Sequence, residues 1–434
     1  MTTLPTPSAT LLTPSKPRPL WRHGAFMTLL TGQTISLIGS MVSFLALPLT
    51  AVLILSANPA QMGILMAVEY APATVVGLFA GVWVDRMRKR PVLILTDLGR
   101  GLLLGSIPVA LYLGMHEMSY LYVVAFLVGV LTIFFAVAYQ AYLPVLVQRE
   151  SLVAANGALE ASSSAARLLG PGMAGALVQL FTAPLAILAD AASFLLSAIF
   201  LLFIRTSEPR IERRETGMWR EIGAGLRFII GHRLLRVTLL TTGTCNFFSG
   251  NLNAQVVLFA TRELHIAPLG IGGVFVVSSL IGGVAASLAG WIGRSLGIGR
   301  VVVIALLLLG VGTMCLPLAA GAPEAVLLIV GAGASLNAIS DGLYNVSVVS
   351  LRQLATPIDL QARTAAAGRV MISIAQPLGA LGGGFLAMTI GLRSALLITA
   401  CGYFLAFLVA FVSPLRHLRH VPPLEEPAAA EQAV

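Results

Sequence analysis

Charge is the scarcest feature of this sequence. Only 10% of its 434 residues are Asp, Glu, Lys or Arg, whereas ordinary soluble proteins carry about 25%. Apolar residues make up 57%, and the mean hydropathy is +0.91. A water-soluble fold of this length needs more charge to cover its surface. The composition therefore excludes a soluble enzyme, a secreted domain and a disordered regulator, and it indicates that lipid surrounds most of the chain.

Cysteine and lysine are also scarce. Cys245, Cys315 and Cys401 stand singly inside apolar runs, as small buried hydrophobic residues do, and their spacing suits no metal or redox centre. Neither of the two lysines, Lys16 and Lys89, follows a glycine, so the Gly-Lys pair of a nucleotide-binding P-loop is missing. The zinc motif H-E-x-x-H and the nucleophile motif G-x-S-x-G are missing as well. We therefore expect no enzymatic activity, no metal and no cofactor.

Long apolar runs are what the sequence has in place of charge. A membrane-spanning helix takes ~20 apolar residues, so a chain of this length has room for roughly twelve. The runs lie near 24–54, 61–83, 91–113, 119–147, 157–180 and 184–204, and then near 236–260, 267–292, 301–320, 324–350, 364–390 and 394–414. We expect an all-α polytopic membrane protein with twelve transmembrane helices in two six-helix halves.

Three polar segments divide the chain. Residues 1–20 hold five prolines and predict a disordered cytoplasmic tail, and residues 415–434 predict a second cytoplasmic tail. Residues 205–235 form a charged linker between the halves at 21–204 and 236–414. Within the linker, apolar residues from Met218 to Ile230 recur at helical spacing, which predicts an amphipathic helix at the membrane surface.

The placement of basic residues gives the expected topology. Of the Lys and Arg residues, 22 fall in the tails, the linker and the loops of one side, and only Arg262 and Arg393 fall on the other. Cytoplasmic loops carry this excess in membrane proteins. We expect both termini in the cytoplasm and a multi-pass protein of a bacterial inner membrane. The basic runs are read as a topology signal, and nucleic acid is not an expected partner.

The two halves repeat one pattern. A tyrosine, two arginines and a proline follow one another at nearly equal spacing in each half: Tyr139, Arg149, Arg167 and Pro171, then Tyr344, Arg352, Arg369 and Pro377. Parallel repeats of six helices, joined by a charged linker, are a transporter architecture.

The loop after the second run carries the sharpest motif, Gly81-Val-Trp-Val-Asp85-Arg86-Met-Arg88-Lys89-Arg90. Gly81 allows a close approach of another helix. Asp85 can accept hydrogen bonds from a neighbouring helix N-terminus, and the basic residues can pair with carboxylates. Such a loop can act as a breakable latch between two rigid halves, or it can be a basic loop with one chance Asp.

This segment resembles the loop 2–3 signature of the major facilitator superfamily, G-x-x-x-D-R-x-x-R-[KR]. The resemblance implies that Gly81, Asp85, Arg86, Arg88 and Arg90 latch the inward gate, although Arg88 and Lys89 occupy the stretch where the family has a glycine. Members of this fold usually act as monomers. Strings that begin at Gly32, Leu188, Ser350 and Ser413 are similar to the secretion-effector branch, which includes enterobactin-exporter-like and macrolide-efflux-like proteins.

Two further features bear on direction and coupling. Gly170, Pro171 and Gly175 in the fifth run are similar to the G-P-x-x-G-G element of antiporter-type exporters, and they also suit a packing kink. Many proton antiporters of the family carry an Arg in the fourth helix. Residues 119–147 contain none, which leaves the coupling ion open.

Ionisable residues within the spans are functional candidates. Glu69 stands without a basic neighbour, so desolvation favours its neutral form and it can carry a proton. Asp341 can carry a proton or bind a cationic substrate, and Asp190 is a third candidate with a structural role as the alternative. Asp97 and Arg100 are three residues apart and predict a structural ion pair.

Polar and aromatic stripes predict a central cavity. The candidate lining residues are Gln33, Ser36, Ser40, Phe135, Tyr139, Asn246, Asn253, Asn337 and Arg167. Hydrogen bonding between helices is the alternative for each of them. A cavity of amides, hydroxyls and aromatic rings suits a bulky amphipathic molecule.

We therefore expect a secondary transporter that exports a drug-like or siderophore-like compound by proton antiport and alternating access. Two alternatives remain: an importer or facilitator of a small metabolite, and a membrane receptor or scaffold that moves nothing.

Overall fold

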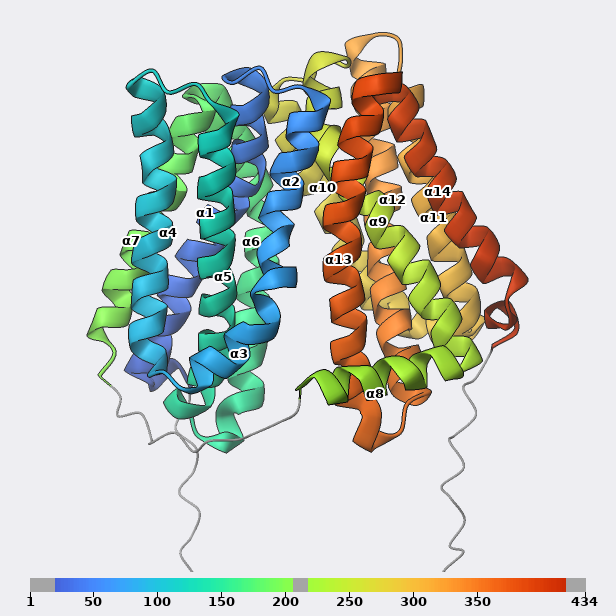
Figure 1. Cartoon of the computed structure of the whole chain (residues 1–434), viewed down its shortest axis with the longest axis horizontal. Coiled ribbons are helices and arrows are strands. Elements are labelled where there is room, and N and C mark those ends of the chain that lie inside the picture. The colour runs from blue at the N-terminus through green and yellow to red at the C-terminus, as the bar shows by residue number, and fades with distance from the viewer. Residues whose placement is uncertain (1–19, 206–217, 419–434) are drawn as a thin grey trace, which may run out of the picture.

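The computed structural model describes residues 20–205 and 218–418, and every regular element in these ranges is a helix. The first half holds α1 (Gly24–Leu53), α2 (Pro59–Val75), α3 (Gly77–Asp85), α4 (Lys89–Tyr112), α5 (Met118–Leu146), α6 (Leu152–Leu180) and α7 (Ala183–Phe203) (Figure 1). The second part holds α8 (Met218–Gly231), α9 (Arg233–Arg262), α10 (Pro268–Leu296), α11 (Ile298–Leu318), α12 (Pro323–Leu354), α13 (Ile358–Ile390) and α14 (Leu392–Val412). The predictions made for the two tails and for linker residues 206–217 fall outside the described residues.

The helices are those of a protein that crosses a membrane many times. Nine helices of the described ranges are long and apolar enough to span a bilayer, and α2 with α3 makes a tenth if this bent pair counts as one span. The more polar α6 and α9 are as long, with 29 and 30 residues. Large apolar side chains such as Leu102, Leu180 and Leu328 are exposed, which suits contact with lipid. The predicted all-helical polytopic fold is confirmed.

The second run departs from the single helix predicted over 61–83. The structure divides it into α2 and α3, which meet at an angle of 55°. Pro72 lacks a backbone N–H and disturbs the last turn of α2, and the pair Val75-Val76 followed by Gly77 weakens the helix at the same place. Hydropathy is continuous across this break, so the sequence pattern did not reveal it.

The packing of the helices repeats in the two halves. In the first half α1 packs on α6 and α7, and α4 packs on α5 and α7. In the second half α9 packs on α13 and α14, and α11 packs on α12 and α14, which are the corresponding helices. The internal repeat read from the sequence is therefore a repeat of structure. The halves meet through two equivalent pairs, α2 with α13 and α6 with α10.

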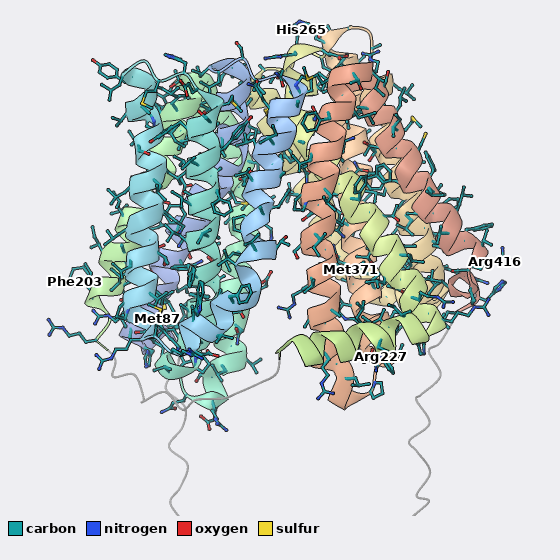
Figure 2. All side chains as sticks on the ribbon, viewed as in Figure 1. Met87, Phe203, Arg227, His265, Met371 and Arg416 are labelled. Carbon is teal, nitrogen blue, oxygen red and sulfur yellow. The ribbon has the colours of Figure 1, made fainter. Side chains whose placement is uncertain are left out.

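The bundle has two ends. Helix α8 lies across one end, which we call the linker side (Figure 1). It shares an apolar cluster there with α9, α13 and the residue that follows α12, through Ile229, Leu235, Ala367 and Ala355. Met87 and Arg227 lie on this side, whereas His265 lies at the opposite end, which we call the distal side (Figure 2).

Glycine pairs close the distal side. A Cβ added to Gly63 of α2 would lie 2.8 Å from the Cα of Gly384 of α13, and one added to Gly175 of α6 would lie 3.1 Å from the Cα of Gly272 of α10. Backbones approach this closely only where side chains are missing. Gly175 belongs to the predicted Gly170-Pro171-Gly175 element, and Gly170 packs against Met41 of α1. We call the contacts of Gly63 with Gly384 and of Gly175 with Gly272 the distal seal.

The space between the halves widens towards the linker side, although α2 stays in contact with α13 as far as Thr74, which donates to the carbonyl of Ser373. Met62, Met66, Glu69 and Ala73 follow one another along one face of α2, and their exposure rises from fully buried at Met62 to exposed at Ala73. Along α6, Ala174 and Pro171 are buried, whereas Arg167 and Glu160 nearer the linker side are exposed. The protein is therefore open to the linker side and closed at the distal side.

Candidate functional site

A cavity of about 560 Å³ lies inside the second half. Its walls come from α9, α10, α11, α12, α13 and α14, and a cavity of this size suits a drug-sized molecule. Its polar lining consists of Thr242, Asn246, Ser249, Asn253, Ser278, Ser279, Asn337, Ser340, Asp341, Tyr344, Asn345 and Tyr403. Helical periodicity brings these residues together, since Thr242, Asn246, Ser249 and Asn253 share one face of α9.

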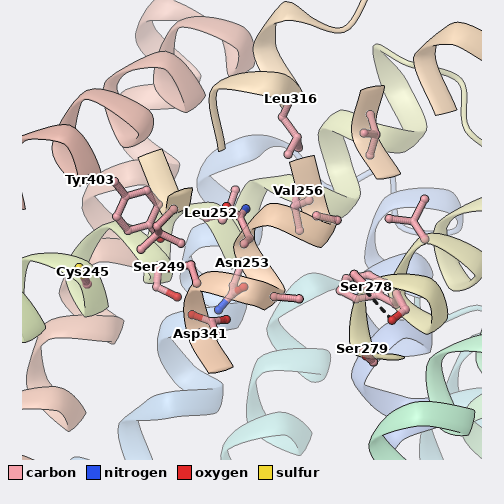
Figure 3. Close-up of a pocket in the computed structure, with 18 of the residues that line it drawn as sticks. Cys245, Ser249, Leu252, Asn253, Val256, Ser278, Ser279, Leu316, Asp341 and Tyr403 are labelled. Atoms are coloured by element: carbon pink, nitrogen blue, oxygen red, sulfur yellow. Dashed lines mark hydrogen bonds between the residues drawn. The ribbon is translucent and has the colours of Figure 1, made fainter. Parts of the chain in front are cut away.

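Asp341 supplies the cavity's carboxylate. It lies midway along α12, its side chain is exposed to the cavity, and it points towards Ser249 and Asn253 of α9 (Figure 3). Within the described ranges Asp341 forms no ion pair. None of the described residues that line the cavity is Lys, Arg or His. The described lining of the cavity therefore contains one carboxyl group and no basic side chain.

Four predicted residues, Asn246, Asn253, Asn337 and Asp341, meet at this cavity. Asn246 donates from Nδ2 to the carbonyl of Thr242 at 2.8 Å, and Asn253 donates to the hydroxyl of Tyr70 at 3.2 Å. Asn337 exchanges longer hydrogen bonds with Thr313 of α11, so its amide serves the contact between helices as well as the cavity.

The predicted residues of the first half lie outside this cavity. Ser36 is buried on the face of α1 that packs on α7, and Ser40 donates to the carbonyl of Ser36 at 2.9 Å. The Gln33 side-chain oxygen is buried and accepts no hydrogen bond from the described residues. Arg167 forms an ion pair of 2.6 Å with Glu160, seven residues away on the exposed face of α6.

A buried charge cluster occupies the core of the first half. Asp97 and Arg100 of α4 form the predicted ion pair, which is confirmed, and both are almost completely buried. Asp190 of α7 is 1% exposed and accepts from Ser193 at 3.1 Å. The sequence did not reveal how Arg100 is held: its guanidinium lies 4.3 Å from the ring centre of Phe135 and 4.2 Å from that of Phe194.

This arrangement accounts for Phe135 and Tyr139. Phe135 is 5% exposed and stacks on Tyr139 with ring centres 5.8 Å apart. Phe135 therefore packs on the Arg100 cation inside the first half, and Tyr139 packs on Phe135, whereas the sequence predicted both as cavity walls.

Glu69 lies at the closed end of the opening. It is half-buried on the α2 face between buried Met66 and exposed Ala73, and it forms no hydrogen bond or ion pair with any described residue. The next residue, Tyr70, accepts the hydrogen bond from Asn253 of the cavity. Glu69 is thus adjacent to the one polar link between α2 and the cavity that the described contacts contain.

The latch motif lies open on the linker side. Asp85 ends α3, is exposed, and forms no ion pair with the described residues. A Cβ added to Gly81 would meet nothing within 4 Å. Arg86 and Arg88 are exposed, whereas Arg90 donates to the carbonyls of Leu201 and Leu202 at the end of α7.

The sequence missed Thr242, Cys245, Ser249, Ser278, Ser279, Ser340 and Tyr403 as cavity residues. Thr242 and Ser249 share the α9 face of Asn246 and Asn253, so the period of that stripe could have found them. Tyr403 comes from α14, and no local pattern points to it. Among the described residues, no group of three or more His, Cys, Asp or Glu residues is placed to hold a metal ion.

Comparison with known proteins gives one family. The family model described as Major Facilitator Superfamily matches residues 29–367 and also residues 239–433. A Bacillus subtilis (strain 168) protein described as "Uncharacterized MFS-type transporter YfiS" is 28% identical over 406 residues, which cover 88% of this chain and 92% of that protein.

Solved structures share the fold. The nucleoside transporter NupG superposes with a TM-score of 0.71 at 12% identity, covering 89% of this chain and 99% of that one. A bacterial homologue of the iron transporter ferroportin in its inward-facing state gives 0.67 at 18%, covering 91% and 99%. A bacterial homologue of the lysosomal transporter Spinster, inward-facing and unoccupied, gives 0.68 at 14%, covering 94% and 100%. At these identities the likeness shows the fold alone.

Proposed function

We propose that this chain, which belongs to the major facilitator superfamily, exports a small amphipathic organic compound by alternating access, in exchange for protons. Membership makes the protein a membrane transporter that handles small molecules. Direction, substrate and coupling go beyond membership. They are supported by the opening to the linker side, by the cavity in the second half and by the position of Glu69.

The opening to the linker side supports the proposed direction of transport. The excess of Lys and Arg on the linker side favours a cytoplasmic position for it in a bacterial inner membrane. Two of the solved structures with this fold are also described as inward-facing. The cavity then receives its substrate from inside the cell and releases it after the distal seal opens. The secretion-effector strings in the sequence agree with this direction.

Glu69 is the proposed proton carrier, and its position is the observation that carries the proposal. In this conformation the carboxyl meets the cytoplasmic opening, where it can lose a proton. When the distal seal opens, the same face of α2 turns outward and can take one up. A neutral carboxyl removes the cost of burying a charge between the halves, so protonation favours the return to the inward-open state.

The register of α2 and α13 indicates how the latch closes. Gly63 faces Gly384, and Thr74 donates to the carbonyl of Ser373, so equal steps along the two antiparallel helices keep them in contact. If α3 straightens onto α2, the same register brings Gly81 to Ala366 and Asp85 to the start of α13 beside Arg363. Neither Asp85 nor Arg363 is in an ion pair with the described residues in the open state.

The test is efflux of rhodamine 123 from an efflux-deficient bacterium that expresses the protein. Wild-type efflux should stop with a protonophore, and Glu69→Gln should abolish it at equal membrane expression. Glu160→Gln is the matched control, because Glu160 is exposed and already paired with Arg167. Efflux that continues at the same rate with the protonophore would contradict proton exchange. A rate equal to that of cells without the protein would contradict export of such amphiphiles.

A further inference from the structure

The cavity lining has one acidic side chain and, among the described residues, no basic one to pair with it. Asp341 is a carboxylate without an ion partner among the described residues, and none of the described lining residues is basic. The next basic residue on α12 is Arg352, about 16 Å further along the helix at 1.5 Å per residue. In an apolar surrounding a lone carboxylate calls for a cation or a proton.

Three asparagines of the cavity use their side-chain donors within the protein and leave their side-chain acceptors unused. Asn246, Asn253 and Asn345 each use Nδ2 as a donor: to the Thr242 carbonyl, to the Tyr70 hydroxyl and to the Asp341 carbonyl. These bonds set the orientation of each amide. The three Oδ1 atoms accept no hydrogen bond from the described residues. The wall near Asp341 is therefore rich in acceptors and suits a ligand with N–H donors.

Polarity changes along the length of the cavity. On α9 the lining residues Asn246 and Ser249 lie nearer the linker side, and Leu252 and Val256 lie nearer the distal side. The other helices agree, because Phe275 of α10 and Leu316 of α11 also line the distal part. Figure 3 shows Asp341 with Ser249 and Asn253, and Val256 and Leu316 on the other side of Asn253.

We propose that this cavity binds an amphipathic organic monocation in one orientation, with its charged N–H group at Asp341 and its apolar part towards Val256 and Leu316. This inference rests on the proposed function only in taking that ligand as the exported substrate. Because every lining residue belongs to the second half, the ligand moves with that half as the halves rock.

Head-group selectivity tests the charge. The purified protein should bind rhodamine 123 in a fluorescence polarisation assay, in which 4-phenylbutylammonium, 4-phenylbutanol and 4-phenylbutyrate are added as competitors. A hydrogen-bonded charge pair predicts that the ammonium ion competes about ten- to hundredfold better than the alcohol, and that the carboxylate is the weakest. Equal competition by the alcohol, or no binding of rhodamine 123 to folded wild-type protein, would overturn the proposal.

Asp341→Asn should remove the preference for the ammonium ion over the alcohol, and Asp341→Glu should keep it. Glu324→Gln is the matched control, because Glu324 lies on the same helix but at its distal start, outside the cavity. If Asp341→Asn does not fold, the competition series on the wild-type protein still tests whether the cavity prefers a cationic head group, since it needs no variant.

Chain length tests the orientation. Phenylalkylammonium ions with two, four and six methylenes should bind about fourfold more tightly per methylene while the chain still gains burial. Val256→Asn should reduce this gain and leave the two-methylene ion nearly unchanged. The same loss for all three chain lengths would contradict the orientation. All these binding measurements are made without a proton gradient. If proton-coupled export is contradicted, the binding proposal can still hold. If the binding proposal is contradicted, proton-coupled export is still decided by the efflux test.

Discussion

Asn253 of α9 donates a hydrogen bond of 3.2 Å from its side-chain nitrogen to the hydroxyl oxygen of Tyr70 of α2. This contact joins the wall of the cavity in the second half to the first half. Tyr70 follows Glu69 directly in α2. The proposed proton carrier is therefore the chain neighbour of a residue that is hydrogen-bonded to the wall of the proposed substrate site. The bond forms across the surface at which the halves must slide or separate.

Tyr70→Phe should therefore shift the conformational equilibrium away from the linker-open state. A hydrogen bond between membrane helices contributes about 0.6 kcal/mol on average, which corresponds to about a threefold change in population. Distances between spin labels across the distal seal would report it. Tyr122→Phe is the matched control, because Tyr122 donates to the carbonyl of Gln61 within the first half. An equal shift for both variants would contradict the assignment.

Gly63→Val should open the distal seal. The added side chain meets the backbone of Gly384, and overpacking of this kind costs about 1–3 kcal/mol. In a background without native cysteines, a cysteine at Met66 should become reactive from the distal side. Gly331→Val adds the same side chain to a helix position with nothing within 4 Å and should leave the reactivity unchanged.

Asp97→Asn should destabilise the folded protein strongly. It leaves the buried Arg100 cation without its ion partner, and the loss of one partner of a buried pair costs about 3–5 kcal/mol. Thermal unfolding in detergent would show a large drop in Tm. Glu160→Gln breaks an exposed pair worth at most about 1 kcal/mol and should change Tm little. Similar Tm values for the two variants would mean that Arg100 does not depend on Asp97.

Asp85→Arg should slow transport about three- to fivefold by weakening the closed latch, since an exposed ion pair contributes up to about 1 kcal/mol. Arg363→Asp should do the same, and the double variant should recover the rate if the two residues meet when α3 straightens. Glu150→Arg makes the same charge change elsewhere on the linker side and serves as the control. A double variant slower than either single variant would exclude this partner for Asp85.

Local spacing predicted the parts of the molecule that depend on one helix. Asp97 and Arg100 are three residues apart, and their ion pair followed from that spacing alone. The polar stripe on α9 likewise placed Asn246 and Asn253 on one face, and both line the cavity. Hydropathy placed the helices themselves, because twenty apolar residues suit a lipid environment and little else.

Contacts between helices were harder to predict, because a polar stripe does not say which neighbour it faces. Ser36 is turned to α7 since Gly32 and Gly39, on the same face of α1, let that helix approach closely. Phe135 looked like a cavity wall, and the structure places it on the Arg100 cation. Tyr403 needed the packing of α14 on α9, which no local pattern contains.

The most direct test of proton-coupled export is a proton flux measured with purified protein. In proteoliposomes that hold a pH-sensitive dye and no imposed voltage, a gradient of rhodamine 123 should drive protons in the opposite direction. Glu69→Gln should abolish this proton movement, and Glu160→Gln should retain it. Transport of rhodamine 123 by the wild-type protein with no accompanying proton movement would contradict proton-coupled export.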